Sequence, residues 1–127
     1  MFRGIDGILL YSQDPEKLAS FYKEKVGMEI GESAEYGEDY KDKFYGFKVG
    51  DSEQFVVLHH SNIKGKNKEP YRFMINFEVK NIEEAVNRLK QNKVRLIQDI
   101  YHVEDYGKIA TFEDIDGNYF QLVQVRP

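Results

Sequence analysis

The sequence predicts an α+β fold made of two βαβββ modules within one domain. Three observations support this prediction: a strand followed by a capped helix occurs twice, strand-like segments follow each helix, and the chain is long enough for one core. Its 127 residues are 41% hydrophobic and 31% charged, and they include nine Tyr and nine Phe. This length and composition suit a single folded domain over residues 1–127.

The first module opens with the apolar, β-leaning run Gly7–Tyr11. Asp14 is a favourable helix cap and Pro15 suits the first helical turn, so a helix is expected to follow. Gly27 supplies the stop signal for this helix. Its apolar residues recur at helical spacing, at Leu18, Ala19, Tyr22 and Val26.

The second module repeats this succession. The segment Phe73–Val79 alternates between apolar and polar residues, which is typical of a strand with one buried face. Asn81 then takes the capping position ahead of a second helix. The apolar stripe of this helix consists of Ile82, Ala85, Val86 and Leu89.

Strand-like segments complete each module. Asp116 and Gly117 separate the last two of them, a pattern typical of a tight β-hairpin. The polar segment 63–69 is expected to link module 1–62 to module 70–127. The expected strands are Glu29–Ala34, Phe44–Val49 and Gln54–His60 in the first module, and Val94–Tyr101, Lys108–Glu113 and Tyr119–Val125 in the second.

Three segments in this order resemble the vicinal oxygen chelate superfamily, which includes glyoxalases, bleomycin resistance proteins and extradiol dioxygenases. They are the helix entry DPEKLASFY at 14–22 with VGM at 26–28, the strand-to-helix entry FEVKNIEEA at 77–85, and the closing hairpin FEDIDGNYFQL at 112–122. The resemblance covers essentially the whole chain. It implies the glyoxalase/bleomycin resistance/dihydroxybiphenyl dioxygenase-like fold.

The resemblance also identifies the positions where metal-dependent members of the group carry His and Glu ligands. Gly7 stands at the first His, Met74 at the second and Gln121 at the closing Glu, while internal symmetry puts the remaining position at Val57. These residues are unsuited to Zn²⁺, Ni²⁺ or Fe²⁺, and only the amide oxygen of Gln121 offers a weak ligand. We therefore expect no metal and no other cofactor.

Strand alternation predicts which side chains face the concave side of the sheets. The expected lining mixes apolar, aromatic and amide groups, as organic ligand sites do, although a filled interior or a dimer contact would have a similar composition. Glu78 and His59 are the residues on this side to consider as a catalytic base. An ion-paired Glu and a hydrogen-bonded His are the alternatives. The expected ligand-binding residues are Gly7, Leu9, Tyr11, Val57, His59, Met74, Asn76, Tyr119 and Gln121.

These observations favour a metal-free protein that sequesters a small organic molecule of unspecified identity, as the resemblance to bleomycin resistance proteins implies. One alternative is a lyase, isomerase or dioxygenase-type enzyme with divergent or relocated active-site residues. Another is an interaction module whose concave side is filled by side chains. Sheet edges and the resemblance predict a homodimer, with the modules paired either within one chain or across a swapped dimer.

Charge and composition argue against several other partners. The net charge of -4 disfavours nucleic acid, and the basic run 64–68 lacks interleaved aromatic residues. The chain has no Cys, no signal-peptide pattern and no apolar run long enough to span a membrane, which predicts a cytoplasmic protein. The acidic, tyrosine-rich segment 35–45 is expected to form a solvated loop, with a mobile lid as the alternative.

Overall fold

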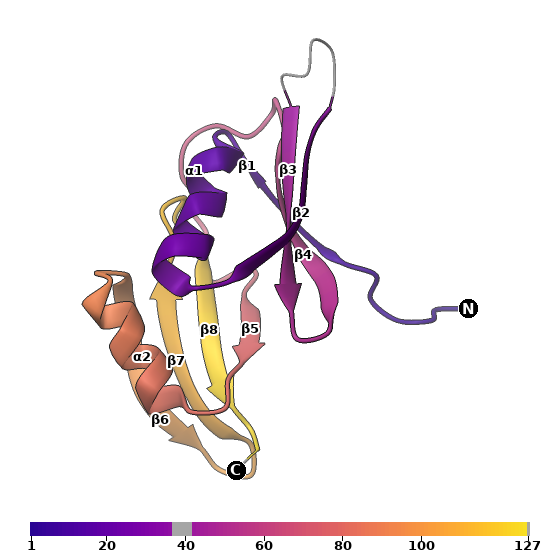
Figure 1. Cartoon of the computed structure of the whole chain (residues 1–127). Coiled ribbons are helices and arrows are strands. Elements are labelled where there is room, and N and C mark those ends of the chain that lie inside the picture. Colours follow the sequence, from indigo (N-terminus) through magenta and orange to yellow (C-terminus); the bar gives the residue numbers. More distant parts are fainter. Residues whose placement is uncertain (37–41, 127) are drawn as a thin grey trace. The chain divides into compact units, whose positions relative to one another are not determined.

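The computed structural model describes residues 1–36 and 42–126 and contains the predicted α+β fold of two βαβββ modules. Figure 1 shows the helices and strands in chain order. The first module consists of β1 (Ile8–Ser12), α1 (Pro15–Ser20), the π-helix η1 (Phe21–Val26), β2 (Glu29–Tyr36), β3 (Asp42–Val49) and β4 (Ser52–His59). The second consists of β5 (Ile75–Glu78), α2 (Ile82–Gln91), β6 (Arg95–Val103), β7 (Gly107–Glu113) and β8 (Tyr119–Gln124).

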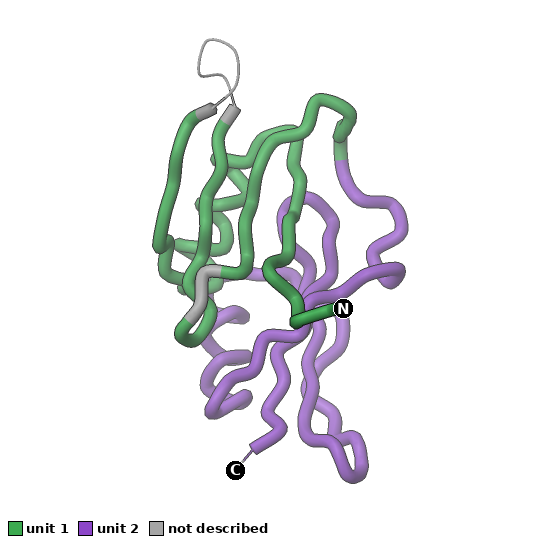
Figure 2. The backbone as a smooth tube through the Cα atoms, turned by 90° about the vertical axis from the view of Figure 1, so that its right-hand side faces the viewer, with its two compact units in different colours: residues 1–65 green, residues 66–127 purple. Residues whose placement is uncertain are grey.

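Each module forms its own four-stranded sheet, with the same strand arrangement in both. The orders are β1-β4-β3-β2 and β5-β8-β7-β6. The first and last strands of each module run parallel, and the other neighbouring pairs are antiparallel. The backbone divides into two compact units, residues 1–65 and 66–127 (Figure 2).

The first helix begins and ends at the predicted residues. The carboxylate of Asp14 accepts a hydrogen bond from the backbone N–H of Lys17 at 3.2 Å, and Pro15 occupies the first turn. The helix continues as the wider π-helix η1. Its last turn is closed by a hydrogen bond from the N–H of Gly27 to the carbonyl of Tyr22. Gly27 has a φ of 90°, a left-handed conformation that suits glycine.

The second helix also begins at the predicted cap. The side-chain oxygen of Asn81 accepts from the N–H of Glu84 at 3.0 Å, and that of Gln124 accepts from the N–H of Ile82 at 2.9 Å. Three residues of the predicted stripe, Ile82, Val86 and Leu89, are buried, while the fourth, Ala85, is only half-buried. No helix in the described ranges has the length and apolar character that crossing a membrane requires.

Aromatic rings form the centre of each core, between the helix and one face of the sheet. In the first module the ring of Tyr22 contacts those of Phe47 and Phe55 edge-on, with centroids 6.3 and 5.2 Å apart. In the second module Phe112 and Phe120 stack at 6.1 Å. Figure 1 shows α2 lying along the β6–β7 side of its sheet, so each helix covers one sheet face and leaves the other without a helix from its own module.

The closing hairpin forms the predicted tight turn. The buried carboxylate of Asp114 accepts hydrogen bonds from the N–H groups of Asp116 and Asn118, at 2.8 and 3.0 Å. Gly117 has a φ of 81°, and a Cβ there would lie 2.9 Å from the carbonyl oxygen of Asn67. Both the backbone conformation and the close approach therefore require glycine at this position.

Two expected boundaries are wrong. Phe73 was expected to pack in the core, but β5 begins only at Ile75 and the Phe73 side chain is 63% exposed. The segment 35–45 was expected to be a loop, but β2 extends to Tyr36 and β3 starts at Asp42. The alternative of a lid falls on residues 37–41, which lie outside the described residues.

Candidate ligand-binding site

The face of the second sheet opposite α2 holds the most distinctive group of side chains, and we call it the site face. Along β8, Phe120 and Leu122 are buried against the helix side of the sheet. Because successive side chains of a strand alternate, Gln121 belongs to the opposite side. Strand register then assigns residues of β5, β6 and β7 to the same face.

A row of uncharged polar residues crosses the site face, with one residue from each strand. The backbone register pairs Asn76 with Gln121, Gln121 with Thr111, and Thr111 with Gln98. The amide Nε2 of Gln121 donates a hydrogen bond to Oγ1 of Thr111 at 3.0 Å. We call these four residues the amide row.

A pocket of about 410 Å³ lies over Gln98, Thr111 and Gln121 of this row. Met74 contributes a thioether wall, and Tyr101 contributes an aromatic ring. Tyr71 also lines the pocket, and its ring meets that of Tyr119 edge-on with centroids 4.9 Å apart. The complete lining is Tyr71, Met74, Gln98, Tyr101, Thr111 and Gln121, and none of these side chains carries a charge at neutral pH.

Two carboxylates of this face form ion pairs on either side of the amide row. Glu78 accepts from the guanidinium of Arg126 at 2.5 Å, and Glu113 lies 3.3 Å from that of Arg95. Glu78 is thus the ion-paired group that the sequence left as the alternative to a catalytic base.

The corresponding face of the first sheet is mainly apolar. Register pairs Leu9 with Val56, and Tyr11 with Leu58. A pocket of about 590 Å³ on this face includes Tyr11, Val56 and Leu58, and the ring of Tyr11 meets that of His60 edge-on at 5.4 Å. The two modules therefore carry different chemistry on equivalent faces.

Two expected site residues lie on the other side of the first sheet. Val57 pairs with Leu10 and is 0% exposed, so it belongs to the core under the helix and not to the concave lining. His59 pairs with the buried Ser12 and follows the same alternation, although it borders the first-sheet pocket at the end of β4. Val56 pairs with Leu9 on the first strand of its module, as Gln121 pairs with Asn76 on the first strand of the second module. The residue equivalent to Gln121 is therefore Val56, one residue before the expected Val57.

The remaining expected residues fall into two groups. Met74, Asn76, Tyr119 and Gln121 share the site face of the second sheet. Leu9 and Tyr11 share the equivalent face of the first sheet and are 53% and 38% exposed. Gly7 precedes β1, and a Cβ there would lie 3.3 Å from the backbone oxygen of Gln54, so it offers less free space than expected.

Sequence reasoning missed four residues of the pocket. Thr111 was detectable, since a polar residue between the apolar Ala110 and Phe112 is expected on the opposite face of the strand. Gln98 and Tyr101 were not, because register shifts between Leu96 and Tyr101 interrupt the alternation of β6. Tyr71 lies outside any strand, where period-two patterns give no information.

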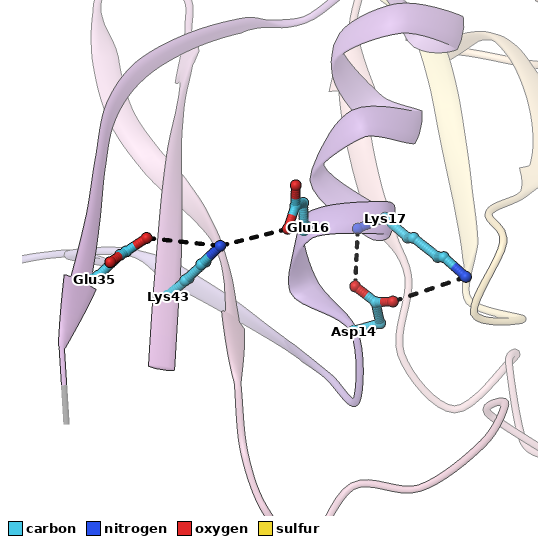
Figure 3. A network of polar contacts seen from close by, with 5 residues as sticks. All are labelled: Asp14, Glu16, Lys17, Glu35 and Lys43. Carbon is cyan, nitrogen blue, oxygen red and sulfur yellow. Dashed lines mark hydrogen bonds and ion pairs between the residues drawn. The ribbon is translucent and has the colours of Figure 1, made fainter. Parts of the chain in front are cut away.

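Outside these faces, an ion-pair network joins the first helix to the first sheet (Figure 3). The ammonium of Lys43 lies 3.4 Å from Glu16 on α1 and 3.6 Å from Glu35 on β2. The charge of Glu16 is the main reason that the pKa of Lys43 is raised, while burial is the main reason that the pKa of Tyr45 is raised. Because these groups are largely solvated and already paired, the network fits a tether between helix and sheet.

No group of three or more His, Cys, Asp or Glu side chains that could hold a metal ion occurs among residues 1–36 and 42–126.

Comparisons with known proteins agree with this fold. Residues 4–122 match the family model described as the Glyoxalase/Bleomycin resistance protein/Dioxygenase superfamily. The uncharacterized protein YetH of Bacillus subtilis is 28% identical over 122 residues, covering 96% of this chain and 98% of YetH.

Two solved structures illustrate the range of proteins with this fold. Glyoxalase I of Leishmania major is 20% identical with a TM-score of 0.74, covering 97% of this chain and 87% of that one. TnmS3, an antibiotic binding protein from Streptomyces sp. CB03234, is 17% identical with a TM-score of 0.72, covering 98% of each chain.

Proposed function

Because the chain belongs to the glyoxalase/bleomycin resistance protein/dioxygenase superfamily, we propose that it binds and sequesters a small organic molecule on the site face without a metal ion. The observation that carries this proposal is the pocket over the amide row, whose lining combines thioether, phenol, hydroxyl and amide groups. Its volume of about 410 Å³ lies within the range of ligand pockets, roughly 300–1,000 Å³.

The donor set does not fit the metal that the superfamily's enzymes carry. Of the equivalent positions, Met74 provides a thioether and Gln121 an amide already bonded to Thr111. In the first module Gly7 has no side chain, and Val56, the residue equivalent to Gln121 by strand register, has no donor atom. Divalent ions in His and carboxylate sites need imidazole or charged oxygen ligands, so no step of the proposed function involves a metal.

An enzymatic role is the less favoured reading of the same site. A general base needs a basic group within reach of the bound molecule. Glu78 is held by Arg126 at 2.5 Å, and His59 follows the helix side of the first sheet. TnmS3, by its description an antibiotic binding protein, supports the view that this fold serves binding on its own.

We further propose that the protein is a homodimer that acts in the cytoplasm. The strands β5 and β6 form the edges of the second sheet, and β1 and β2 those of the first. Covering such edges by pairing prevents uncontrolled association, and a symmetric dimer is the simplest way to do so. The cysteine-free chain suits a reducing compartment.

A thermal-shift screen of a small-molecule library tests the binding function. Met74→Glu places a charge in the pocket and is expected to abolish stabilisation by the hits, while Met28→Glu makes the same change in the other module and should retain it. Hits that stabilise Met74→Glu as well as the wild type would contradict the proposed site. Elemental analysis should find far less than one Zn, Ni or Fe per chain, and a stoichiometric metal would overturn the metal-free assignment.

A further inference from the structure

Resting on the proposed function, we infer that the ligand is a neutral, planar heteroaromatic molecule with a lactam-like edge, which the Gln121–Thr111 pair recognises. A lactam edge is an N–H donor next to a C=O acceptor. The pair presents the complementary arrangement, an acceptor beside a donor.

The hydrogen bond from Gln121 to Thr111 uses one amide hydrogen and one hydroxyl lone pair. The carbonyl oxygen of Gln121 and the hydroxyl hydrogen of Thr111 then remain available, one as an acceptor and the other as a donor. If the amide turns over and the hydroxyl donates instead, the amide supplies the donor and the hydroxyl the acceptor. In both arrangements the pair offers one donor beside one acceptor.

The rest of the amide row extends this recognition surface. Asn76 lies beside Gln121 on β5, and Gln98 lies beside Thr111 on β6. Neighbouring strands are about 4.8 Å apart, so the row spans roughly 14 Å. That length accommodates two or three fused rings with polar atoms along one edge.

Aromatic rings beside the row favour a flat ligand. Tyr71 is 70% exposed and Tyr101 is 41% exposed, so both present ring surface that a planar molecule would cover. The edge-on contact with Tyr119 holds the Tyr71 ring in a defined orientation. Offset or edge-on aromatic contacts of this kind add to the gain from burying the rings.

The charges around the pocket favour a neutral ligand. The lining contains no charged side chain, and the nearby carboxylates Glu78 and Glu113 already pair with Arg126 and Arg95. A charged molecule would lose hydration here without gaining an ion pair. A neutral molecule with hydrogen-bonding groups avoids that cost.

Among residues 1–36 and 42–126, the matching row of the first sheet lacks this donor–acceptor pair. The equivalent row in the first sheet, by the same register, consists of Leu9, Val56, Gly46 and Glu32. Neither Leu9, Val56 nor Gly46 has a side-chain donor or acceptor. The lactam-reading site is therefore expected once per chain.

Three matched probes test this inference by NMR titration of the ¹⁵N-labelled wild type. They are 2-quinolinone, which has the lactam edge, 2-methoxyquinoline, which lacks the N–H donor, and quinoline-2-carboxylate, which is charged. We expect 2-quinolinone to shift the resonances of Gln121 and Thr111 and to bind about tenfold more tightly than either analogue, the effect of losing about one hydrogen bond. Equal binding of 2-methoxyquinoline, or tighter binding of the carboxylate, would overturn the inference.

Variants at the pair provide the second arm. Gln121→Leu and Thr111→Val are expected to remove the preference for 2-quinolinone, and Thr111→Ser, which keeps the hydroxyl, should retain it. Gln91→Leu makes the same amide-to-alkyl change on an exposed position of α2 and serves as the control. A preference that survives both Gln121→Leu and Thr111→Val contradicts the role of the pair.

The proposed ligand class and the proposed binding function can fail separately. If the probes bind the site face without regard to the lactam edge, the ligand class is wrong and the binding function stands. If neither these probes nor the hits of the library screen shift resonances of the site face, the binding function and the ligand class fail together.

Discussion

Replacing Val57 and Val56 separately by Ala measures which of these adjacent residues faces the core. Val57 is 0% exposed and shares the helix side with Leu10, while Val56 is half-buried on the opposite face. Each substitution removes two methyl groups. Because both replace Val by Ala in the same strand, the loss of β-propensity is the same and cancels when the two variants are compared. The difference in unfolding free energy therefore reports burial.

The expected magnitudes follow from what each side chain contacts. Two buried methyl groups contribute about 1.6 kcal/mol by transfer, and the cavity that remains raises the cost of Val57→Ala to about 2–3 kcal/mol. Val56→Ala should cost less than about 1 kcal/mol because its side chain is already partly hydrated.

Urea denaturation monitored by circular dichroism gives the unfolding free energies of both variants. The comparison requires that the slope of this free energy against urea concentration, the m-value, is the same in the wild type and the variants. Equal losses would contradict the assigned difference in burial, and a greater loss at Val56 would place Val56 on the helix side of the sheet. The register that matches Gln121 to Val56 would then be wrong. The comparison of the amide row with its equivalent in the first sheet would be wrong as well.

Further predictions concern assembly, the closing hairpin and acid stability. Light scattering is expected to give twice the chain mass at micromolar concentration, and a monomer mass throughout that range would refute the proposed dimer. Asp114→Ala removes the acceptor for the N–H groups of Asp116 and Asn118 and should destabilise the protein by about 1–3 kcal/mol in urea titrations; no measurable loss would contradict the capping role. The hydrogen bond from Lys108 lowers the pKa of Glu83 below 4.5, so its small stabilising effect is present above that pH and is lost as the pH falls. Lys108→Met should therefore differ from the wild type at neutral pH and converge with it in acid, and a constant difference at all pH values would argue against this linkage.

The parts of the fold that were predictable have local signals. The helix starts at Asp14 and Asn81 and the turn at Gly117 depend on side chains that satisfy nearby backbone groups or tolerate a positive φ. The duplication then predicted the arrangement of each module, since the same succession occurs twice.

The errors arise where the local signal is absent. In β4 the run from Val56 to Leu58 is apolar throughout, so alternation cannot assign its faces, and an alignment shifted by one residue exchanged them. At Phe73 the apolar pattern starts before the point where strand pairing begins, at Ile75. Three of the six pocket residues, Tyr71, Gln98 and Tyr101, lie in β6 or before β5, where register shifts or irregular backbone hide the periodicity.

Because pocket and core residues alternate along β8, a substitution can change ligand preference without changing the residues that stabilise the fold. Phe120 and Leu122 hold the core, and Gln121 between them meets the pocket, so its replacement leaves the buried contacts on either side in place. The same holds on β7, where Thr111 lies between Ala110 and Phe112. A lineage of such proteins could therefore exchange one bound compound for another through a few substitutions on the odd-numbered positions of two neighbouring strands, with little cost to the stability of the scaffold.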